Sequence, residues 1–585
     1  MNQKDLSKII DYLEDLKSED VKKRAAAVRH IHLISEVFGP EKTKQTLLPF
    51  LKEYEDDDEE VMIELANQLE LLGQLISEKE NNAHELLPYY YIILSYEDAS
   101  VVEAGMQSLY RLVTKFSLKH DNLAHLAKKL FTVGYPKALI SSSRIFCELN
   151  GYLGTKYSND INKIITDNIN NKYAIVRKET AIALRHLLGE NLPYDGLALT
   201  CLKKLLKDSQ DSVRVFALES LCAGKHGKSY FMNNIFTLVL PMFDQKSWRI
   251  RYICAKAMPR LLMASQTNAK KQLIDAYVKL FKDDEKEVSI AAIDSLRDSV
   301  KFIEPEDIVS KIIPVLKDIV AIPIQEIKIA LAGSILHLVP VISKNYSNEH
   351  IKDMLIQLLK DENSQVKVEL FRHQEPLSHV ISSNSLVAIL TPVMKELIND
   401  RDWRIREKGL KAYDIYLSKL GEVYCSSEAV VDILKNILSD RVFIVRRRAI
   451  ELVRDLCLQF GAKWTEKYGL TVLSSFTSNP SYLHRLNYLF GIKEIYHILS
   501  KQALNAEVDT ISKMIKDLVP NVRFNALLLL ITIYSKTEDS LLEEKIIKIT
   551  KFMENDVDSE VERLVVRLNS TPNFKSNVRK ILGAN

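Results

Sequence analysis

The feature that most constrains this chain is a short phrase that recurs at nearly even intervals. Each copy has a turn of acidic or small polar residues, then Val or Ile, usually Arg or Lys, and an apolar helix. Clear copies are DSVRVFALESL, DWRIREKGL and PNVRFNALLLL, which begin at Asp211, Asp402 and Pro520. The Val or Ile positions lie 37 residues apart from Val213 to Ile250 and 40 apart from Ile405 to Val445. A period near forty with two amphipathic segments is typical of HEAT-type helix pairs.

The Val or Ile of each copy serves as the anchor of its repeat. The anchors are Val176, Val213, Ile250, Val288, Ile327, Val366, Ile405, Val445, Leu483, Val522 and Val561, with weaker copies at Val21, Val61 and Val101 and an irregular copy near Ala138. Each helix pair has an apolar face that only the next pair can cover, so the pairs must stack. The sequence therefore predicts an all-α fold, an α-α superhelix (solenoid) of about fifteen HEAT repeats.

The turn residues predict how each repeat is held. An Asp or Ser just before the anchor can cap the second helix of the pair, because its side chain can accept from the unpaired amides there. The Arg or Lys after the anchor is expected to pair with a turn acid of its own or a neighbouring repeat. We interpret these contacts as a ladder of exposed ion pairs, each worth about 0–1 kcal/mol.

Composition excludes several classes of protein. The chain has 80 Lys and Arg against 77 Asp and Glu, so it lacks the overall positive charge that drives nucleic-acid binding. The N-terminus does not resemble a signal peptide, and the longest apolar run, from Ala526 to Tyr534, is about half a membrane span. We expect no membrane segment and a cytoplasmic and nuclear location. The cysteines form no C-x-x-C pair and are expected to be buried thiols: Cys147, Cys201, Cys222, Cys254, Cys425 and Cys457.

The sequence offers no recognisable catalytic, metal or cofactor site. Gly227, Lys228 and Ser229 resemble the end of a phosphate-binding loop, but Cys222 stands where that loop needs a glycine. The acidic run 53–60 lacks the glycine and ligand spacing of a calcium loop. The histidines form no metal-binding pair. We therefore expect a protein that is not an enzyme.

Aromatic residues mark unusual turns. Two residues before the anchor the chain mostly places a small or polar side chain, but Trp248, Trp403 and Phe443 stand at that position. Tyr482 lies next to the equivalent position of the following repeat. Exposed aromatics beside arginines are typical of interaction hot spots, although the rings could instead pack sideways on the next repeat. The clustering predicts a late ridge in consecutive repeats and a separate early patch at Trp248.

Four phrases carry a more specific resemblance. KSWRIRYICAKAM, DWRIREKGL, FGAKWTEKYG and NPSYLHRLNYLFGI closely resemble the scaffolding A subunits of protein phosphatase 2A, a family of fifteen-repeat HEAT proteins. EDVKKRAAAVRHI, TLLPFL, DSVRVFALES and NVRFNALLLL follow in that family's order and spacing, so the resemblance covers essentially the whole chain.

The resemblance implies a non-catalytic, horseshoe-shaped scaffold whose partners supply the metals and the chemistry. Repeats 11–15, residues 401–568, would bind a serine/threonine phosphatase catalytic subunit, and residues 1–400, mainly the earlier repeats, a regulatory B-type subunit. The implied catalytic-subunit contacts are Trp403, Arg404, Phe443, Arg446, Tyr482, Leu483, His484, Arg485, Val519, Pro520 and Arg523. The implied regulatory-subunit contacts are Glu60, Arg177, Lys178, Arg214, Trp248, Arg249 and Tyr252.

Some positions depart from the family pattern. The fourth-repeat turn, Gly134 to Leu139, lacks the family's Trp and Arg, which puts regulatory contacts there in doubt. Ser289 replaces a basic residue and should interrupt the ladder, and residues 569–585 form a C-terminal extension, either an extra helix or a loose tail. Two alternatives remain: an importin-type transport receptor, whose acidic and Trp-Asn inner surfaces are not evident, and a helical-repeat nucleic-acid enzyme, which would need a strongly basic concave face.

Overall fold

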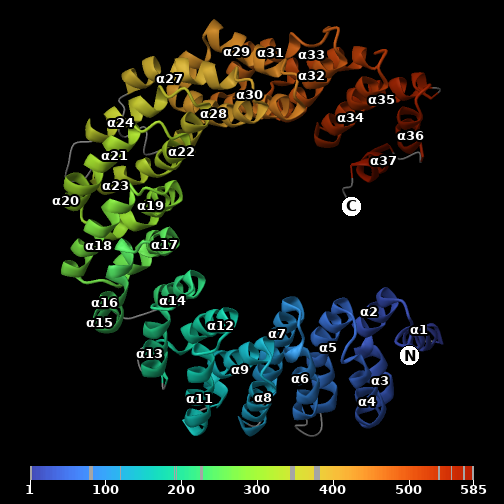
Figure 1. Ribbon diagram of the computed structural model, residues 1–585. Coiled ribbons are helices and arrows are strands. Elements are labelled where there is room, and N and C mark those ends of the chain that lie inside the picture. The colour runs from blue at the N-terminus through green and yellow to red at the C-terminus, as the bar shows by residue number, and fades with distance from the viewer. Residues whose placement is uncertain are drawn as a thin grey trace. The chain divides into compact units, whose positions relative to one another are not determined.

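In the computed structural model the chain consists of helices joined by short turns, and the described residues contain no strand (Figure 1). The all-α fold predicted from the repeat phrase is therefore confirmed. The structure describes residues 3–77, 83–116, 118, 120–153, 155–189, 192, 194–223, 228–342, 349–373, 383–537, 540–554, 556–570 and 574–582.

The chain divides into two compact units, residues 1–319 and 320–585. The first contains α1 (Gln3–Asp15), α2 (Val21–Arg29), α3 (Ile31–Lys42), α4 (Leu48–Leu51), α5 (Glu59–Ser77), α6 (Leu87–Ser95), α7 (Ala99–Lys115), α8 (His120–Val133), α9 (Pro136–Glu148), α10 (Asn150–Leu153), α11 (Ser158–Ile169), α12 (Ala174–Leu184), α13 (Asp195–Leu205), α14 (Asp211–Ala223), α15 (Lys228–Tyr230), α16 (Phe236–Val239), α17 (Trp248–Ala264), α18 (Thr267–Leu280), α19 (Lys286–Ser299) and α20 (Pro305–Asp307). Helix α21 (Ile313–Val320) ends at the boundary.

The second unit continues the same alternation. It contains α22 (Gln325–Ser334), α23 (Val339–Ile342), α24 (Glu349–Leu359), α25 (Ser364–Leu370), α27 (Ser383–Ile398), α28 (Trp403–Cys425), α29 (Glu428–Leu438), α30 (Phe443–Trp464), α31 (Leu470–Ser474), α32 (Tyr482–Ile495), α33 (Lys501–Met514), α34 (Pro520–Thr537), α35 (Ser540–Phe552), α36 (Ser559–Leu568) and α37 (Phe574–Ile581). Short 3-10 or π-helical turns extend several of these helices.

The second helix of each repeat, here called its B helix, begins at the turn that carries the repeat phrase. The B helices are α2, α5, α7, α9, α12, α14, α17, α19, α22, α25, α28, α30, α32, α34 and α36. Within each unit consecutive B helices pack on one another, as α17 does on α19 and α28 on α30. Figure 1 shows the B helices of each unit as a layer beside the first helices of the pairs. Stacking therefore covers the apolar faces, as the repeat predicts.

The anchors form the core of this layer. Val61, Val213 and Val445, for example, are at most 1% exposed, whereas Val21 is only half-buried. The anchor assigned to Leu483 is wrong, because that side chain is 37% exposed. The adjacent His484 takes the anchor place, where its ring packs edge-on against Phe476 at 5.8 Å. Spacing alone placed this anchor to within one residue. The pattern of aliphatic anchors favoured Leu483 over His484, because histidine is not an aliphatic residue.

The fourth-repeat turn, which departs from the family pattern, has its own local structure. Gly134 has φ +82°, a left-handed conformation that favours glycine, and Tyr135 is 64% exposed immediately before α9. Pro136 begins the helix, and Leu139 packs in a buried cluster with Val176. An apolar residue therefore replaces the ladder cation at this repeat.

The C-terminal extension contains a packed helix. In α37, Phe574 and Val578 are buried, and the Phe574 ring meets Tyr534 of α34 edge-on at 5.2 Å. The extra-helix alternative is therefore the correct one for residues 574–581.

One helical stretch, Gln325–Ile342, is long and apolar enough to cross a membrane by length and composition, and 61% of it is buried inside the protein. Burial of this kind is typical of a core helix in a repeat layer. All six cysteines are buried as expected, and burial raises the pKa of the Cys222 thiol to about 12.

Candidate protein-binding ridge

Three aromatic side chains occupy the same position in consecutive repeats. Trp403, Phe443 and Tyr482 are the first residues of α28, α30 and α32, and Pro520 is the first residue of α34. The corrected anchor His484 places Tyr482 two residues before its anchor, in register with the other rings. Together these four first residues, Trp403, Phe443, Tyr482 and Pro520, form the ridge.

The exposure of the ridge side chains separates the two sequence-based interpretations. Phe443 is 54% exposed and Tyr482 is 41% exposed, so neither ring is core filler. Trp403 is half-buried, and the guanidinium of Arg404 lies 4.7 Å from its ring centroid. The sideways-packing alternative therefore fits Trp403 in part but does not fit Phe443 or Tyr482.

Two neighbouring apolar residues were not singled out from the sequence. Leu518 is 95% exposed in the turn before α34, and Ile444 is 48% exposed beside Phe443. The expected contacts Val519 and Pro520 are half-buried in the same turn. Most repeats place a polar residue, Gly or Pro at this turn position, so an apolar residue there is a signal that would have identified Leu518, as well as Val557, which is 100% exposed in the turn before α36.

Beneath the ridge lies the predicted ladder. Arg406 donates from Nε and Nη2 to the carboxylate of Asp440 at 2.7 and 2.9 Å. Arg485 forms the same two-bond pair with Asp517 at 2.6 and 2.8 Å. In α34, Arg523 does so with Asp556. The ladder is confirmed, but its members are not exposed, because the Arg406 and Asp440 side chains are only 8% and 11% exposed.

The ladder occupies two residues that the resemblance assigned to the catalytic subunit. The hydrogen bond from Arg523 to Asp556 raises the pKa of Arg523 and lowers that of Asp556. Arg485 and Arg523 are each 14% exposed, and their charges are balanced within the chain. Their guanidinium groups are used in contacts that hold the turns together, whereas the Arg404 side chain is 67% exposed.

The turns themselves are held by a repeated side-chain contact. Asp440 Oδ1 accepts from the Val442 amide at 2.8 Å, and Asp517 Oδ1 accepts from the Val519 amide at 2.9 Å. Asp402 caps α28 by accepting from Arg404 at 2.9 Å, as predicted, but Ser481 makes no side-chain cap to α32. The acid at the start of the turn therefore fixes its shape and also holds the ladder arginine.

The early patch lies in the first unit around the start of α17. Trp248 is half-buried, meets Tyr252 edge-on at 6.4 Å, and has the Arg249 guanidinium 4.7 Å from its ring centroid. Ser247, just before Trp248, donates to Asp211 at 2.6 Å. The bond between Ser247 and Asp211 links the start of α17 to the start of α14 in the preceding repeat.

The other expected regulatory contacts lie on preceding B helices. Arg177 donates to Asp208 at 2.7 and 2.9 Å and is a ladder residue. Its neighbour Lys178 lies 4.8 Å from the Phe216 ring centroid. Glu60 is exposed in the first turn of α5.

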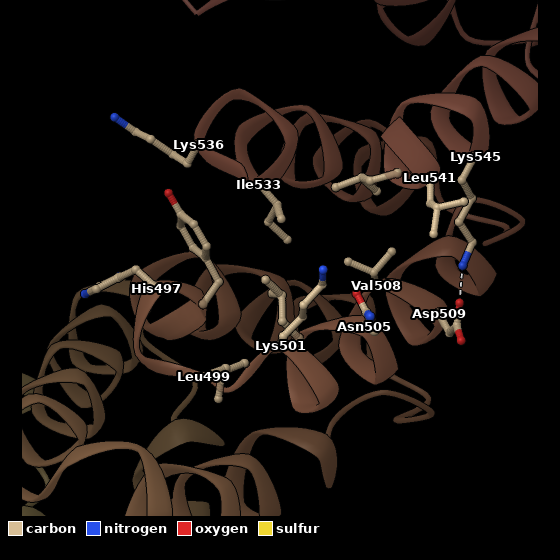
Figure 2. Close-up of a pocket in the computed structure, with 13 residues that line it drawn as sticks. His497, Leu499, Lys501, Asn505, Val508, Asp509, Ile533, Lys536, Leu541 and Lys545 are labelled. Atoms are coloured by element: carbon tan, nitrogen blue, oxygen red, sulfur yellow. Dashed lines mark hydrogen bonds and ion pairs between the residues drawn. The ribbon is translucent and has the colours of Figure 1, made fainter. Parts of the chain in front are cut away.

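A cavity of about 670 Å³ lies between the C-terminal part of α34 and its neighbours α33 and α35 (Figure 2). Its lining is apolar and cationic, with Lys501 and Lys536 beside Val508 and Leu541, and its acid Asp509 is paired with Lys545. This lining shows no nucleophile held by a base. Across the described residues no three His, Cys, Asp or Glu side chains are grouped to hold a metal ion.

The fold and the ridge together define a class: a helical-repeat solenoid with exposed apolar and aromatic side chains at successive repeat turns. Residues 342–459 match the family described as PIK3R4-like, middle domain. Solved chains with similar folds include Kap121p bound to Pho4p, with a TM-score of 0.61 and 14% identity over 98% of this chain and 62% of that one. A Kap95p chain also gives a TM-score of 0.61, with 11% identity over 96% of this chain and 75% of that one. At these identities the likeness shows the fold alone.

Relatives found by sequence similarity point to a narrower group of proteins than the fold does. The chain is 25% identical to the A-type regulatory subunit of protein phosphatase PP2A from Saccharomyces cerevisiae, over 46% of this chain and 44% of the relative. It is 26% identical to the beta isoform of the human 65 kDa A-type regulatory subunit of serine/threonine-protein phosphatase 2A, over 63% of each chain. The corresponding alpha isoform from Arabidopsis thaliana is 30% identical over 23% of each chain. The resemblance read from the motifs is thus confirmed, and the matches span less than two thirds of these relatives.

Proposed function

We propose that this chain is a non-catalytic scaffold of a protein phosphatase 2A assembly. Its C-terminal repeat turns bind a serine/threonine phosphatase catalytic subunit through the ridge, and its N-terminal repeats bind a regulatory B-type subunit through the patch at Trp248. The names of the sequence relatives support this role. Metals, cofactors and the reaction itself belong to the partner in this proposal, and neither nucleic acid nor membrane is a partner.

The observation that carries the proposal is the alignment of the ridge. Trp403, Phe443 and Tyr482 begin three consecutive B helices of one compact unit, and about half of the Phe443 and Tyr482 side chains is exposed although the rings are apolar. A row of rings at one helix position offers a continuous apolar strip, and aromatic anchors of this kind contribute most of the binding energy in many interfaces. Exposed Leu518 extends the strip into the turn before α34.

The direct test is the affinity of the purified chain for a purified phosphatase 2A catalytic subunit. The double variant Trp403→Ala, Tyr482→Ala should weaken binding by at least about a hundredfold, since each anchor commonly contributes about 1.4 kcal/mol or more, which is a factor of ten. The same variant should retrieve less phosphatase from native lysate.

A matched control removes exposed rings elsewhere. Tyr135 and Tyr173 are 64% and 44% exposed at turns of the first unit, and Tyr135→Ala, Tyr173→Ala should leave the catalytic-subunit affinity unchanged. The proposal fails if the wild-type chain does not bind the catalytic subunit, or if the ridge variant binds as tightly as the wild type while its helical circular dichroism is retained.

A further inference from the structure

One ladder arginine lacks its acid, and it lies on α30 beside the ridge residue Phe443. Arg446 follows the anchor Val445 on α30, as Arg406 follows Ile405 on α28. Its guanidinium lies 5.8 Å from the Phe443 ring centroid. The residue is only 4% exposed.

The turn hydrogen bonds show which residue should have been its partner. At the start of the α32 turn Asn479 Oδ1 accepts from the Ser481 amide at 2.9 Å, as Asp440 accepts from Val442 and Asp517 from Val519. Asn479 therefore occupies the place of the ladder acid. The same oxygen lies 3.1 Å from His484 Nδ1, and the other side-chain group of Asn479 is an uncharged NH₂, which donates and cannot accept from a guanidinium.

Arg446 is left with an incomplete set of partners. Its Nη1 donates to the Asp440 carbonyl oxygen at 2.9 Å, and its buried Nε has no hydrogen-bond partner in the described part of the chain. The carboxylate of Asp440 is held by Arg406. Burial lowers the pKa of Arg446, opposite to the raised pKa of Arg406 and Arg523.

A second interrupted position shows that the chain can compensate for a missing turn acid. Arg214 on α14 also has a buried Nε without a partner, and Gln245 occupies the start of the next turn, where Arg251 donates to its carbonyl oxygen at 2.7 Å. Arg214 nevertheless has a carboxylate, because its Nη2 donates to Asp211 of its own turn at 2.8 Å. No carboxylate of the described residues pairs with Arg446 in this way.

We propose that Arg446 is the docking cation of the ridge: a carboxylate of the bound protein enters between Phe443 and Tyr482 and takes the place that Asn479 leaves without a charge. This inference rests on the proposed function for the identity of the partner. A buried guanidinium without a counter-ion is unfavourable in the free chain. An incoming carboxylate gains a charge-assisted hydrogen bond, which is stronger at a guanidinium shielded from water than at exposed arginines on the rim. The partner surface that covers the ridge therefore carries an acidic side chain among its apolar contacts.

The sharpest test restores the missing acid. Asn479→Asp should complete the ladder and raise the melting temperature by about 2 °C, because a new buried pair stabilises the folded unit. The same variant should weaken catalytic-subunit binding about tenfold, since the internal carboxylate competes for Arg446. Arg446→Gln should weaken binding to a similar extent, and the two changes together should give no further loss, because both remove one interaction.

Asn171→Asp is the matched control. Asn171 Oδ1 accepts from the Tyr173 amide at 2.9 Å in an equivalent turn. The preceding repeat has Leu139 at the ladder position, so the new acid would meet no ladder cation from that repeat. It should change neither binding nor melting temperature.

Two results would overturn the proposal, and they differ from failure of the scaffold role. If Asn479→Asp binds as tightly as the wild type, the partner does not use Arg446. If its melting temperature does not rise, the vacant acid place is wrongly assigned. A wild-type chain that binds no catalytic subunit would instead contradict the proposed function, while the thermal shift would still test the ladder.

Discussion

At the scale of single residues, one arginine in many repeats donates to carbonyl oxygens of its own turn and pairs with the turn acid of the next repeat. The sequence predicted exposed ion pairs of small value, but the structure places Arg406 and Asp440 largely out of water with two parallel hydrogen bonds. Removing one member of such a pair leaves a charge that is poorly hydrated and without a partner. Ser289 interrupts the series as expected, and its hydroxyl donates to the Asp283 carbonyl oxygen at 3.2 Å.

Arg406→Met should therefore lower the free energy of unfolding at pH 7 by about 2 kcal/mol. Burial alone would raise the pKa of Asp440, but its hydrogen bonds with Arg406 lower it overall. A lowered folded-state pKa contributes stability above the unfolded value near 3.9, which is lost as the pH falls through the folded value. The difference between wild type and variant should be complete above about pH 5 and shrink as the pH falls through the lowered pKa of Asp440.

Urea unfolding across this pH range measures the effect. The control is Lys279→Met, which removes an ion pair with Asp244 whose side chains are 66% and 68% exposed. It should cost less than about 0.5 kcal/mol. An Arg406→Met effect as small as that of the control would show that the ladder is not structural.

At the scale of helices, the layer depends on close packing between the two helices of a pair. Helix α28 approaches α27 at Gly409, where an added Cβ would lie 2.9 Å from the Leu397 Cβ and 3.2 Å from its backbone carbonyl carbon. Contacts that short force a neighbouring backbone to move. Gly409 thus permits the close spacing of α27 and α28, the helix that begins with the ridge residue Trp403.

Gly409→Ala should destabilise the chain by about 2 kcal/mol, as overpacked core positions do. Gly196→Ala is the control, because nothing lies within 4 Å of the added Cβ on α13, and Ala favours a helix over Gly by up to about 1 kcal/mol. Thermal unfolding should move in opposite directions for the two variants. Equal shifts would contradict the close approach.

At the scale of the whole molecule, the two predicted partner surfaces lie in different compact units. The Trp248 patch is in residues 1–319, and the ridge is in residues 320–585. In a stack of repeats each pair contacts chiefly its neighbours, so a change in one unit is largely insulated from the other. A scaffold needs this property to hold two partners independently.

Trp248→Ala should thus weaken binding of a regulatory B-type subunit by at least about tenfold while leaving the catalytic-subunit affinity unchanged. Titrating each purified partner separately against the variant measures both effects. Loss of both affinities together would assign Trp248 a structural role, through its contact with Tyr252.

The repeat phrase by itself determined the all-α stack, the buried anchors and the helix position that carries the aromatic rings. Those features follow from local sequence, because hydrophobic periodicity and turn chemistry act within one helix pair. Only the tertiary structure decided that His484 rather than Leu483 is the anchor, that Leu518 is exposed, and that Arg485 and Arg523 are neutralised while Arg446 is not. The arginine pairings depend on contacts between residues more than thirty positions apart. Spacing along one chain does not show which carboxylate pairs with which arginine.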